Sequence, residues 1–245
     1  MLPLADWISD HLLNVEPFEL LGTFGLSWHT LSLFIAAAIM LWLFPKIAQD
    51  DGLVPGKLRS AFEVVLLFIR DEVARPFLHE RTDRYVPVLW TFFFFILLCN
   101  LLGLVPGMAT ATGQVWVTGT LAVMAFLWYE AAGVYEQGLV PYVKNIVPPG
   151  LPLPLIPVLF VIEIVGHLSK PFALMIRLWA NMTGGHAVLY AILGLTFTFG
   201  LAVSPLAVAG GIAVYVLEIF VAFLQAYVFT FLVSVFLGAS VHPEH

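Results

Sequence analysis

Ionisable and amide side chains recur inside one long apolar stretch of the sequence, residues 156–195, where they could bind or move an ion. They are Glu163, His167, Lys170, Arg177, Asn181 and His186. A charge inside an apolar membrane helix is costly, so it needs a partner or a function. Arg177 stays protonated at any realistic pH. It therefore cannot relay protons, but it can repel cations and attract a carboxylate.

These side chains and those of a second apolar stretch, residues 205–239, share helical faces. At about 100° per residue, five of the six fall on one narrow stripe, and only His186 lies well away from it. A polar stripe on an apolar membrane helix must face protein or water. In the second stretch, Glu218 and Gln225 are seven residues apart and share a face with Tyr215.

The two stretches predict an antiparallel hairpin that turns near residue 201. One register places Arg177 opposite Gln225 and also places His186 opposite Glu218. Histidine and glutamate can both exchange protons near neutral pH if water reaches them. The hairpin therefore predicts a proton-exchanging pair close to a fixed positive charge.

A second polar group, formed by Glu163, His167 and Lys170, lies toward the other end of the first stretch. The pattern predicts two separate polar paths, one to each side of a membrane, with the charge of Arg177 between them. A continuous pore would lack such a block. The sequence therefore favours a moving partner that carries the ion across.

Plainer interpretations of the second group stay open. Glu163 and Lys170 could snorkel to the inner membrane interface, and His167 could simply pack or form a hydrogen bond. A metal site built from Glu163, His167 and His186 is not expected, because their spacing puts them on different faces or turns.

The hairpin residues also have plainer interpretations. His186 and Glu218 could hold two helices together without moving protons. Arg177 could form a buried ion pair with Glu218 or with Glu163.

The composition indicates an all-α membrane protein with several spans. Of 245 residues, 61% are hydrophobic and only 11% are charged, whereas a soluble domain has roughly 25% charged residues. The net charge of −6 gives no reason to expect nucleic-acid binding, and no cofactor is expected. The single cysteine, Cys99, excludes an internal disulfide framework. The first residues lack a basic region, so they do not predict a signal peptide.

Hydrophobic patterning predicts one membrane domain, residues 1–245, with about five transmembrane helices, an external N-terminal arm and an amphipathic linker. The arm is 1–27, the spans are 28–45, 85–105, 115–134, 156–195 and 205–239, and the linker is 46–84. Forty residues of helix measure about 60 Å, twice a hydrocarbon core of about 30 Å. The fourth span must therefore be tilted, kinked, for example at Pro171, or divided into two pieces.

The linker 46–84 and the distribution of positive charge predict the orientation. The apolar core of the linker, residues 64–69, is too short to cross, so a helix on the cytoplasmic membrane surface or one packed on a partner protein is expected. Seven of the ten Lys and Arg residues fall in this linker. Positive loops stay inside, so the N-terminus is expected outside and the C-terminus in the cytoplasm.

Three motifs resemble subunit a of the F-type ATP synthase. They are SKPFALMIRLWANMTGGH (169–186), EIFVAFLQAYVF (218–229) and NLLGLVP (100–106). The resemblance implies a non-catalytic stator subunit, in a bacterial plasma membrane, that passes protons to a rotating ring. The implied partners are the c-subunit ring, the b-subunit peripheral stalk, other ATP synthase subunits and membrane lipid.

The resemblance also implies roles for individual residues. Arg177 would face the ring, attract each deprotonated ring carboxylate and stop protons leaking between two aqueous half-channels. The other implied translocation residues are Asn181 and Gln225 beside the arginine, His186 and Glu218 in the outer half-channel, and Glu163 in the inner one. His167, Lys170 and Tyr215 could also line a path. The order histidine then glutamate at the outer positions is that of mitochondrial-type members, whereas some bacterial members have the reverse order.

Two other functions are compatible with an arginine in a membrane helix. A self-contained secondary transporter could use Arg177 to bind an anionic substrate, but no inverted repeat is evident in the sequence. An intramembrane enzyme is disfavoured, because the sequence has no H-E-x-x-H motif and no evident Ser/His or Asp/Asp pair.

Overall fold

A computed structural model describes residues 28–48, 57–105, 108, 110–145, 156–200 and 203–241. The described residues form helices and short turns, with no strand among them. Five helical segments are long and apolar enough to cross a membrane. The predicted all-α polytopic fold is therefore confirmed. The predicted N-terminal arm, 1–27, lies outside the described residues.

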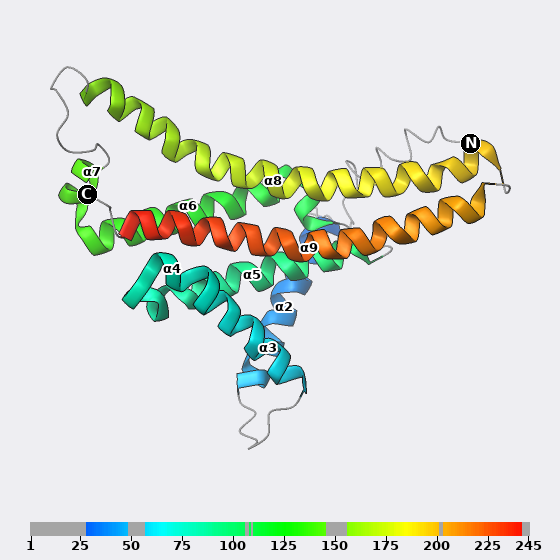
Figure 1. The fold of residues 1–245 in the computed structure, drawn as a ribbon, viewed down its shortest axis with the longest axis horizontal. Coiled ribbons are helices and arrows are strands. Elements are labelled where there is room, and N and C mark those ends of the chain that lie inside the picture. The colour runs from blue at the N-terminus through cyan, green and yellow to red at the C-terminus, as the bar shows by residue number, and fades with distance from the viewer. Residues whose placement is uncertain are drawn as a thin grey trace, which may run out of the picture. The chain divides into compact units, whose positions relative to one another are not determined.

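Figure 1 shows the helices, which follow one another along the chain. They are α2 (Trp28–Ala48), α3 (Lys57–Phe68), η1 (Ile69–Ala74), α4 (Arg75–Leu78), η2 (His79–Arg81), α5 (Thr82–Leu104), η3 (Ala111–Gly113), α6 (Val115–Gln137), α7 (Leu139–Asn145), α8 (Ile156–Phe199) and α9 (Ser204–Val241). The predicted span 156–195, which is too long to cross a membrane perpendicularly, lies within one continuous helix, α8. Pro171 lies inside this helix.

The charged linker is helical over its described part. It forms α3, the π-helix η1, α4 and η2, and it leads directly into α5. One candidate span, Arg59–Leu104, covers most of this helical run together with α5. The position of the linker on a membrane surface stays a prediction.

The chain divides into two compact units, and the boundary between them passes through helices α5, α6, α8 and α9. The first unit contains Met1–Gln49, Phe94–Thr118 and Arg177–Ala226. The second contains Asp50–Phe93, Gly119–Ile176 and Tyr227–His245. His186 and Glu218 of the hairpin lie in the first unit. Glu163, His167 and Lys170, the second polar group, lie in the second unit.

The first unit is built on the predicted hairpin, in which the second half of α8 and the first half of α9 run side by side in yellow and orange in Figure 1. Gly200, with φ of +76°, ends α8 and donates its N–H to the carbonyl of Thr196. This left-handed conformation is one that glycine adopts without steric cost. Buried Leu104, Met182 and Ala222 form a cluster between α5, α8 and α9.

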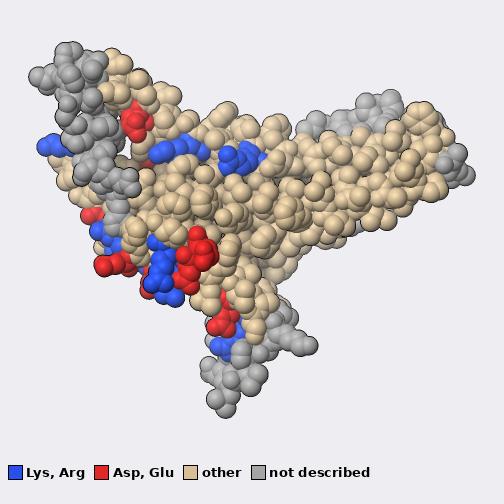
Figure 2. Space-filling view, viewed as in Figure 1, with Lys and Arg blue, Asp and Glu red and all other residues tan. Residues whose placement is uncertain are grey.

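The first unit carries very little charge. Among its described residues, the only Lys, Arg, Asp and Glu side chains are Lys46, Arg177 and Glu218. In Figure 2 the charged atoms gather instead over α3 and α4, which belong to the second unit. Arg177 and Glu218 therefore stand out on a hairpin whose other described residues carry no Lys, Arg, Asp or Glu side chain.

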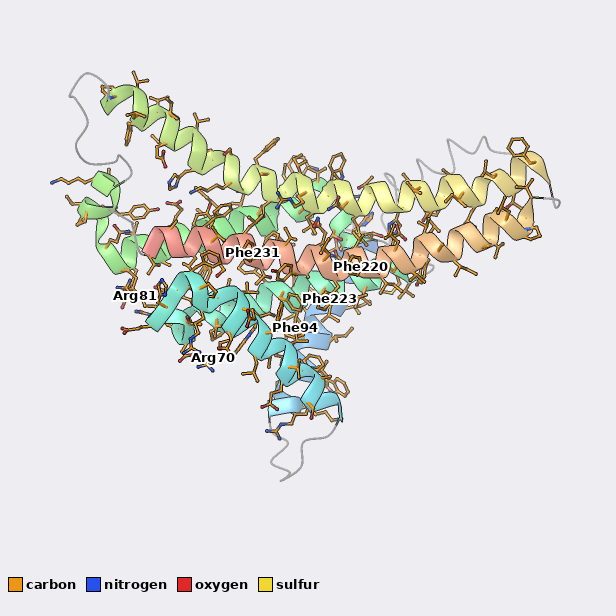
Figure 3. The ribbon with its side chains drawn as sticks, in the orientation of Figure 1. Arg70, Arg81, Phe94, Phe220, Phe223 and Phe231 are labelled. Carbon is orange, nitrogen blue, oxygen red and sulfur yellow. The ribbon has the colours of Figure 1, made fainter. Side chains whose placement is uncertain are left out.

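Ion pairs link helices of the second unit near their ends. Glu136 of α6 binds Arg81 at 3.2 Å and Arg84 at 2.8 Å. Arg70 of η1 binds Asp83 of α5 at 2.8 Å. Figure 3 labels Arg70 and Arg81. Much of the positive charge of the linker is thus paired with carboxylates of the same unit.

Close packing joins the last turns of α9 to η1 and α4 within the second unit. The ring of Phe231, labelled in Figure 3, meets the edge of Phe77 with centroids 5.5 Å apart. A Cβ on Gly238 would lie 2.8 Å from the backbone oxygen of Phe77, so the helices approach too closely for a side chain there. Ser234 donates to the carbonyl of Val73 in the π-helix at 3.0 Å.

Candidate functional site

A buried histidine and a buried glutamate face each other across the hairpin. His186 Nδ1 of α8 lies 3.3 Å from Glu218 Oε1 of α9. Their side chains are only 10% and 8% exposed. The structure therefore brings together the His186–Glu218 pair that the hairpin register places opposite one another.

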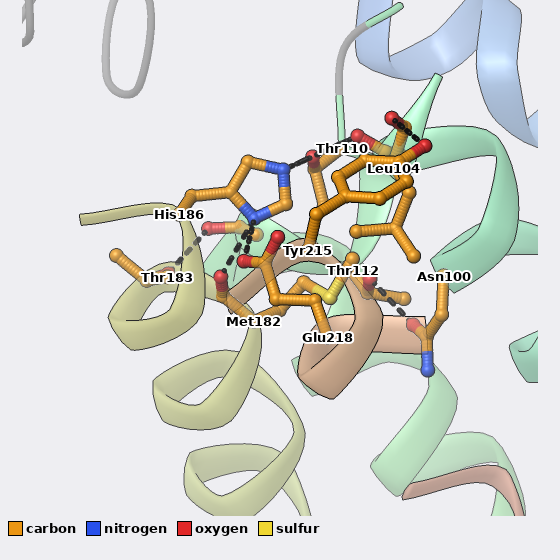
Figure 4. Close-up of polar contacts among 11 residues, drawn as sticks. Asn100, Leu104, Thr110, Thr112, Met182, Thr183, His186, Tyr215 and Glu218 are labelled. Carbon is orange, nitrogen blue, oxygen red and sulfur yellow. Dashed lines mark hydrogen bonds and ion pairs between the residues drawn. The ribbon is translucent and has the colours of Figure 1, made fainter. Parts of the chain in front are cut away.

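Both nitrogens of the His186 ring have acceptors within reach (Figure 4). Nδ1 lies 3.0 Å from the carbonyl of Met182, which can only accept, so Nδ1 donates there when it carries a hydrogen. Nε2 lies 3.0 Å from the Thr110 hydroxyl and 3.2 Å from the carbonyl of Gly103. The Thr110 hydroxyl is also 3.2 Å from that same carbonyl.

The Thr110 hydroxyl fits both charge states of the His186 ring. With a neutral ring, the hydroxyl can donate to Nε2. With a protonated ring, Nε2–H can donate to the hydroxyl, which then donates to the carbonyl of Gly103. A hydroxyl hydrogen rotates to suit its neighbours, so the ring can gain or lose a proton without movement of a heavy atom.

Glu218 depends on His186 for compensation of its charge. Both carboxylate oxygens are buried and have no hydrogen-bond partner among the described residues. A buried carboxylate without hydrogen bonds is costly unless an opposite charge lies beside it. Gly185 leaves room for this carboxylate, since a Cβ at that position would lie 2.5 Å from Glu218 Oε1.

Polar residues of α5, η3 and α9 surround the pair, and the sequence did not single out all of them. Asn100 is fully buried, donates to the carbonyl of Ala222 at 3.2 Å and accepts from the Thr112 hydroxyl at 2.7 Å. Tyr215 donates to the carbonyl of Leu104 at 3.0 Å. Both ends of the Asn100 amide thus have a hydrogen-bond partner.

Arg177 and Asn181 lie on an exposed face of α8, whereas Gln225 is buried. Gln225 Nε2 donates to the backbone carbonyl of Arg177 at 2.7 Å, so the paired residues meet through the backbone and not through the guanidinium. Glu218, the one described carboxylate of this unit, pairs with His186. Within its unit, the guanidinium therefore has no carboxylate partner among the described residues.

The second polar group also includes Glu130 of α6, which lies inside the predicted span 115–134 and was not among the expected site residues. His167 Nδ1 lies 2.8 Å from Glu130 Oε1 of α6, and the hydroxyl of Tyr142 of α7 donates to Glu130 Oε2. Lys170 Nζ lies 5.2 Å from the centre of the Phe236 ring. Glu163 is exposed, one turn before His167. His167 thus has a carboxylate partner, which its position in the sequence did not reveal.

Known proteins match nearly the whole chain. The family model described as ATP synthase A chain matches residues 30–238. An ATP synthase subunit a of Chloroherpeton thalassium is 39% identical over 256 residues, which cover 97% of this chain and 76% of the relative. That of Myxococcus xanthus is 43% identical over 222 residues, covering 89% and 73%. That of Chlorobium phaeobacteroides is 39% identical over 267 residues, covering 98% and 77%.

These matches cover both polar groups and every described helix. They agree with the resemblance carried by the motifs around Arg177, Glu218 and Asn100. The chain is an integral membrane protein of the ATP synthase membrane sector, and it belongs to the ATP synthase A chain family.

Proposed function

We propose that this chain is the ion-translocating stator subunit of an F-type ATP synthase. It provides two aqueous half-channels that Arg177 separates, and it faces a rotating ring of c subunits, so that proton flow drives rotation and ATP synthesis. Membership of the ATP synthase A chain family supports the assignment to this complex. The chain itself catalyses no step of ATP chemistry.

The surroundings of the Arg177 side chain are the main support for this proposal. Its side chain is exposed on an apolar helix, and its own unit offers no free carboxylate among the described residues. An unpaired arginine in a membrane is costly. A carboxylate on a neighbouring chain, about 4 Å away at an effective dielectric constant near 20, would be attracted by about 4 kcal/mol. A ring carboxylate that has just lost its proton supplies such a charge, and one that has been protonated is free to leave.

The two polar groups act as the ends of the two half-channels. His186 and Glu218, with Tyr215 nearby, serve the outer half-channel, and they lie about 14 Å along α8 from Arg177. Glu163, His167 and Lys170 serve the inner one. Asn181 and Gln225 keep the surroundings of Arg177 polar, and Gln225 also fixes the backbone there. Protons pass between the half-channels only on the ring.

The proposal extends to the surroundings of the chain. The c-ring covers the face of α8 that presents Arg177, and the b-subunit peripheral stalk holds the stator in place. The chain lies in a bacterial plasma membrane with its N-terminus outside and its C-terminus in the cytoplasm. The concentration of Lys and Arg in the linker 46–84 supports this orientation.

Replacement of Arg177 by alanine in the assembled complex tests this function. We expect Arg177→Ala to abolish coupled ATP synthesis and ATP-driven proton pumping in inverted membrane vesicles, while the subunit still enters the complex. Arg75→Ala is a matched control, because Arg75 is an exposed arginine whose ion-pair partner among the described residues is Asp71, four positions before it on the same helical run. Normal coupled synthesis by Arg177→Ala would overturn the proposal. Uptake of an anionic substrate by the purified chain in liposomes would favour the secondary transporter instead.

A further inference from the structure

A titratable cluster joins three helices of the second unit. Glu130 of α6 uses one carboxylate oxygen for the His167 ring of α8 and the other for the Tyr142 hydroxyl of α7. Tyr142 is buried, while the side chains of Glu130 and His167 are 22% and 21% exposed. The carboxylate is therefore held in a fixed orientation but is not fully enclosed by its own unit.

A comparison with Glu136 shows what is unusual about Glu130. Both lie on α6, six residues apart. Glu136 binds Arg81 and Arg84, which stay charged, so this contact is a permanent ion pair. Glu130 instead binds a histidine, the side chain that changes charge most readily near neutral pH. The contact of Glu136 keeps its charges at any realistic pH, whereas the contact of Glu130 joins two groups that can exchange protons.

Tyr142 acts only as a donor in this cluster. Burial, and then the hydrogen bond to Glu130, raise the pKa of the Tyr142 hydroxyl above its usual range. The hydroxyl therefore stays protonated and fixes Oε2 of Glu130. The exchange of protons is left to Oε1 and the His167 ring.

The other charged groups of this region also belong to α8. Lys170 lies three residues after His167, with its ammonium group over the Phe236 ring. Glu163 is exposed on the preceding turn. Pro171 has no N–H to give to the carbonyl of His167, so this carbonyl loses its helical partner. A polar atom without a helical partner favours water beside the cluster.

We propose that Glu130 is a proton-exchanging residue of the inner half-channel, acting together with His167, in a position fixed by Tyr142. This inference rests on the proposed function. A proton taken up at His167 Nε2 is balanced by the proton that Nδ1 gives to Glu130 Oε1. The carboxylic acid then loses that proton to water, which leaves the neutral ring with its hydrogen on Nε2. A flip of the ring turns an N–H back toward the Glu130 carboxylate, and the cycle can repeat. No electron transfer is involved.

Glu130→Gln tests this inference, with Glu136→Gln as its matched control on the same helix. We expect Glu130→Gln to lower ATP-driven proton pumping by about tenfold per assembled complex, and to flatten its dependence on inner-side pH. Glu136→Gln should reduce assembly or thermal stability but leave pumping per assembled complex near the wild-type rate. Wild-type pumping and pH dependence in Glu130→Gln would overturn the inference.

Two further variants keep the test decisive if Glu130→Gln fails to assemble. Glu130→Asp keeps an exchangeable proton and should recover part of the rate. His167→Gln keeps a side-chain donor for Glu130 but cannot relay a proton, so it should slow pumping. A purely structural role predicts that His167→Gln pumps normally once assembled, and this result would also overturn the inference.

The failure of this inference and the failure of the proposed function give different results. If Arg177→Ala retains coupled synthesis, the half-channel function itself is wrong. If Arg177→Ala is uncoupled while Glu130→Gln and His167→Gln both pump at the wild-type rate, only the role of Glu130 is wrong.

Discussion

The amide of Gln225 holds the backbone of Arg177, since its Nε2 lies 2.7 Å from the Arg177 carbonyl. The guanidinium is left on the exposed face of α8. A buried side chain thus fixes the height and rotation of the helix at Arg177, while the charged group stays available to a neighbouring chain.

Gln225→Leu should weaken coupling without abolishing it. The substitution removes one buried hydrogen bond, worth about 1 kcal/mol, and lets α8 shift against α9 at Arg177. We expect ATP synthesis to fall several-fold, in contrast to the complete loss expected for Arg177→Ala. Rates per assembled complex measure the effect.

Gln137→Leu is the control for Gln225→Leu, because it also removes a hydrogen bond from a glutamine amide to a backbone carbonyl. Gln137 Nε2 donates to the carbonyl of Ser240 at 2.6 Å, far from Arg177 in the sequence and in the other unit. This variant should lower thermal stability without loss of coupling. Equal coupling in Gln225→Leu and the wild type would contradict the role of Gln225.

Thr110→Val should slow proton flow through the outer half-channel. Valine keeps the shape of threonine but removes the hydroxyl that fits both charge states of His186. We expect about a tenfold slower proton flux in vesicles, with Thr110→Ser close to the wild type. Thr91→Val is a control, because the Thr91 hydroxyl bonds only to the carbonyl of Pro87 in its own helix. A wild-type flux in Thr110→Val would exclude a part for this hydroxyl.

The sequence predicts the hairpin and its polar pairs because two general properties of membrane helices determine which residues face each other. A charge in an apolar segment is conspicuous, and an antiparallel hairpin with a short turn leaves few registers. His186 and Glu218 therefore meet as the register predicts. The register also places Gln225 opposite Arg177, but it does not say which atoms meet. The Gln225 amide bonds to the backbone carbonyl of Arg177 and not to its side chain.

Residues that join the sites from distant parts of the chain could not be predicted. Thr110 lies 76 residues before His186, in a turn whose uncharged sequence indicates only a connection. Glu130 lies 37 residues before His167, near a predicted span end where an acidic residue needs no explanation. Helical periodicity relates residues of one helix, so it gives no signal for contacts made through tertiary packing.

Gly185→Ala should disturb the Glu218 carboxylate directly. The added Cβ would lie 2.5 Å from Oε1, and 3.2 Å from Cγ, so the whole end of the side chain must move away from His186. We expect a lower thermal stability of the purified subunit and a slower proton flux. At Gly184 a Cβ would meet nothing within 4 Å. Gly184→Ala should therefore leave the thermal stability unchanged or slightly higher, because alanine favours a helix. Equal stability of the two variants would contradict this account.

An exchange of the two outer residues tests whether their contact or their order matters. His186→Glu alone places two carboxylates against each other, and Glu218→His alone places two imidazoles there, so each pair loses its opposite charge. We expect both single variants to reduce proton flux by at least tenfold. The double variant restores one imidazole and one carboxylate at a contact of about the same length, so it should recover much of the flux. A double variant as slow as the singles would show that Thr110 and Gly185, which fit a histidine on α8 and a carboxylate on α9, make the order of the pair as important as its presence.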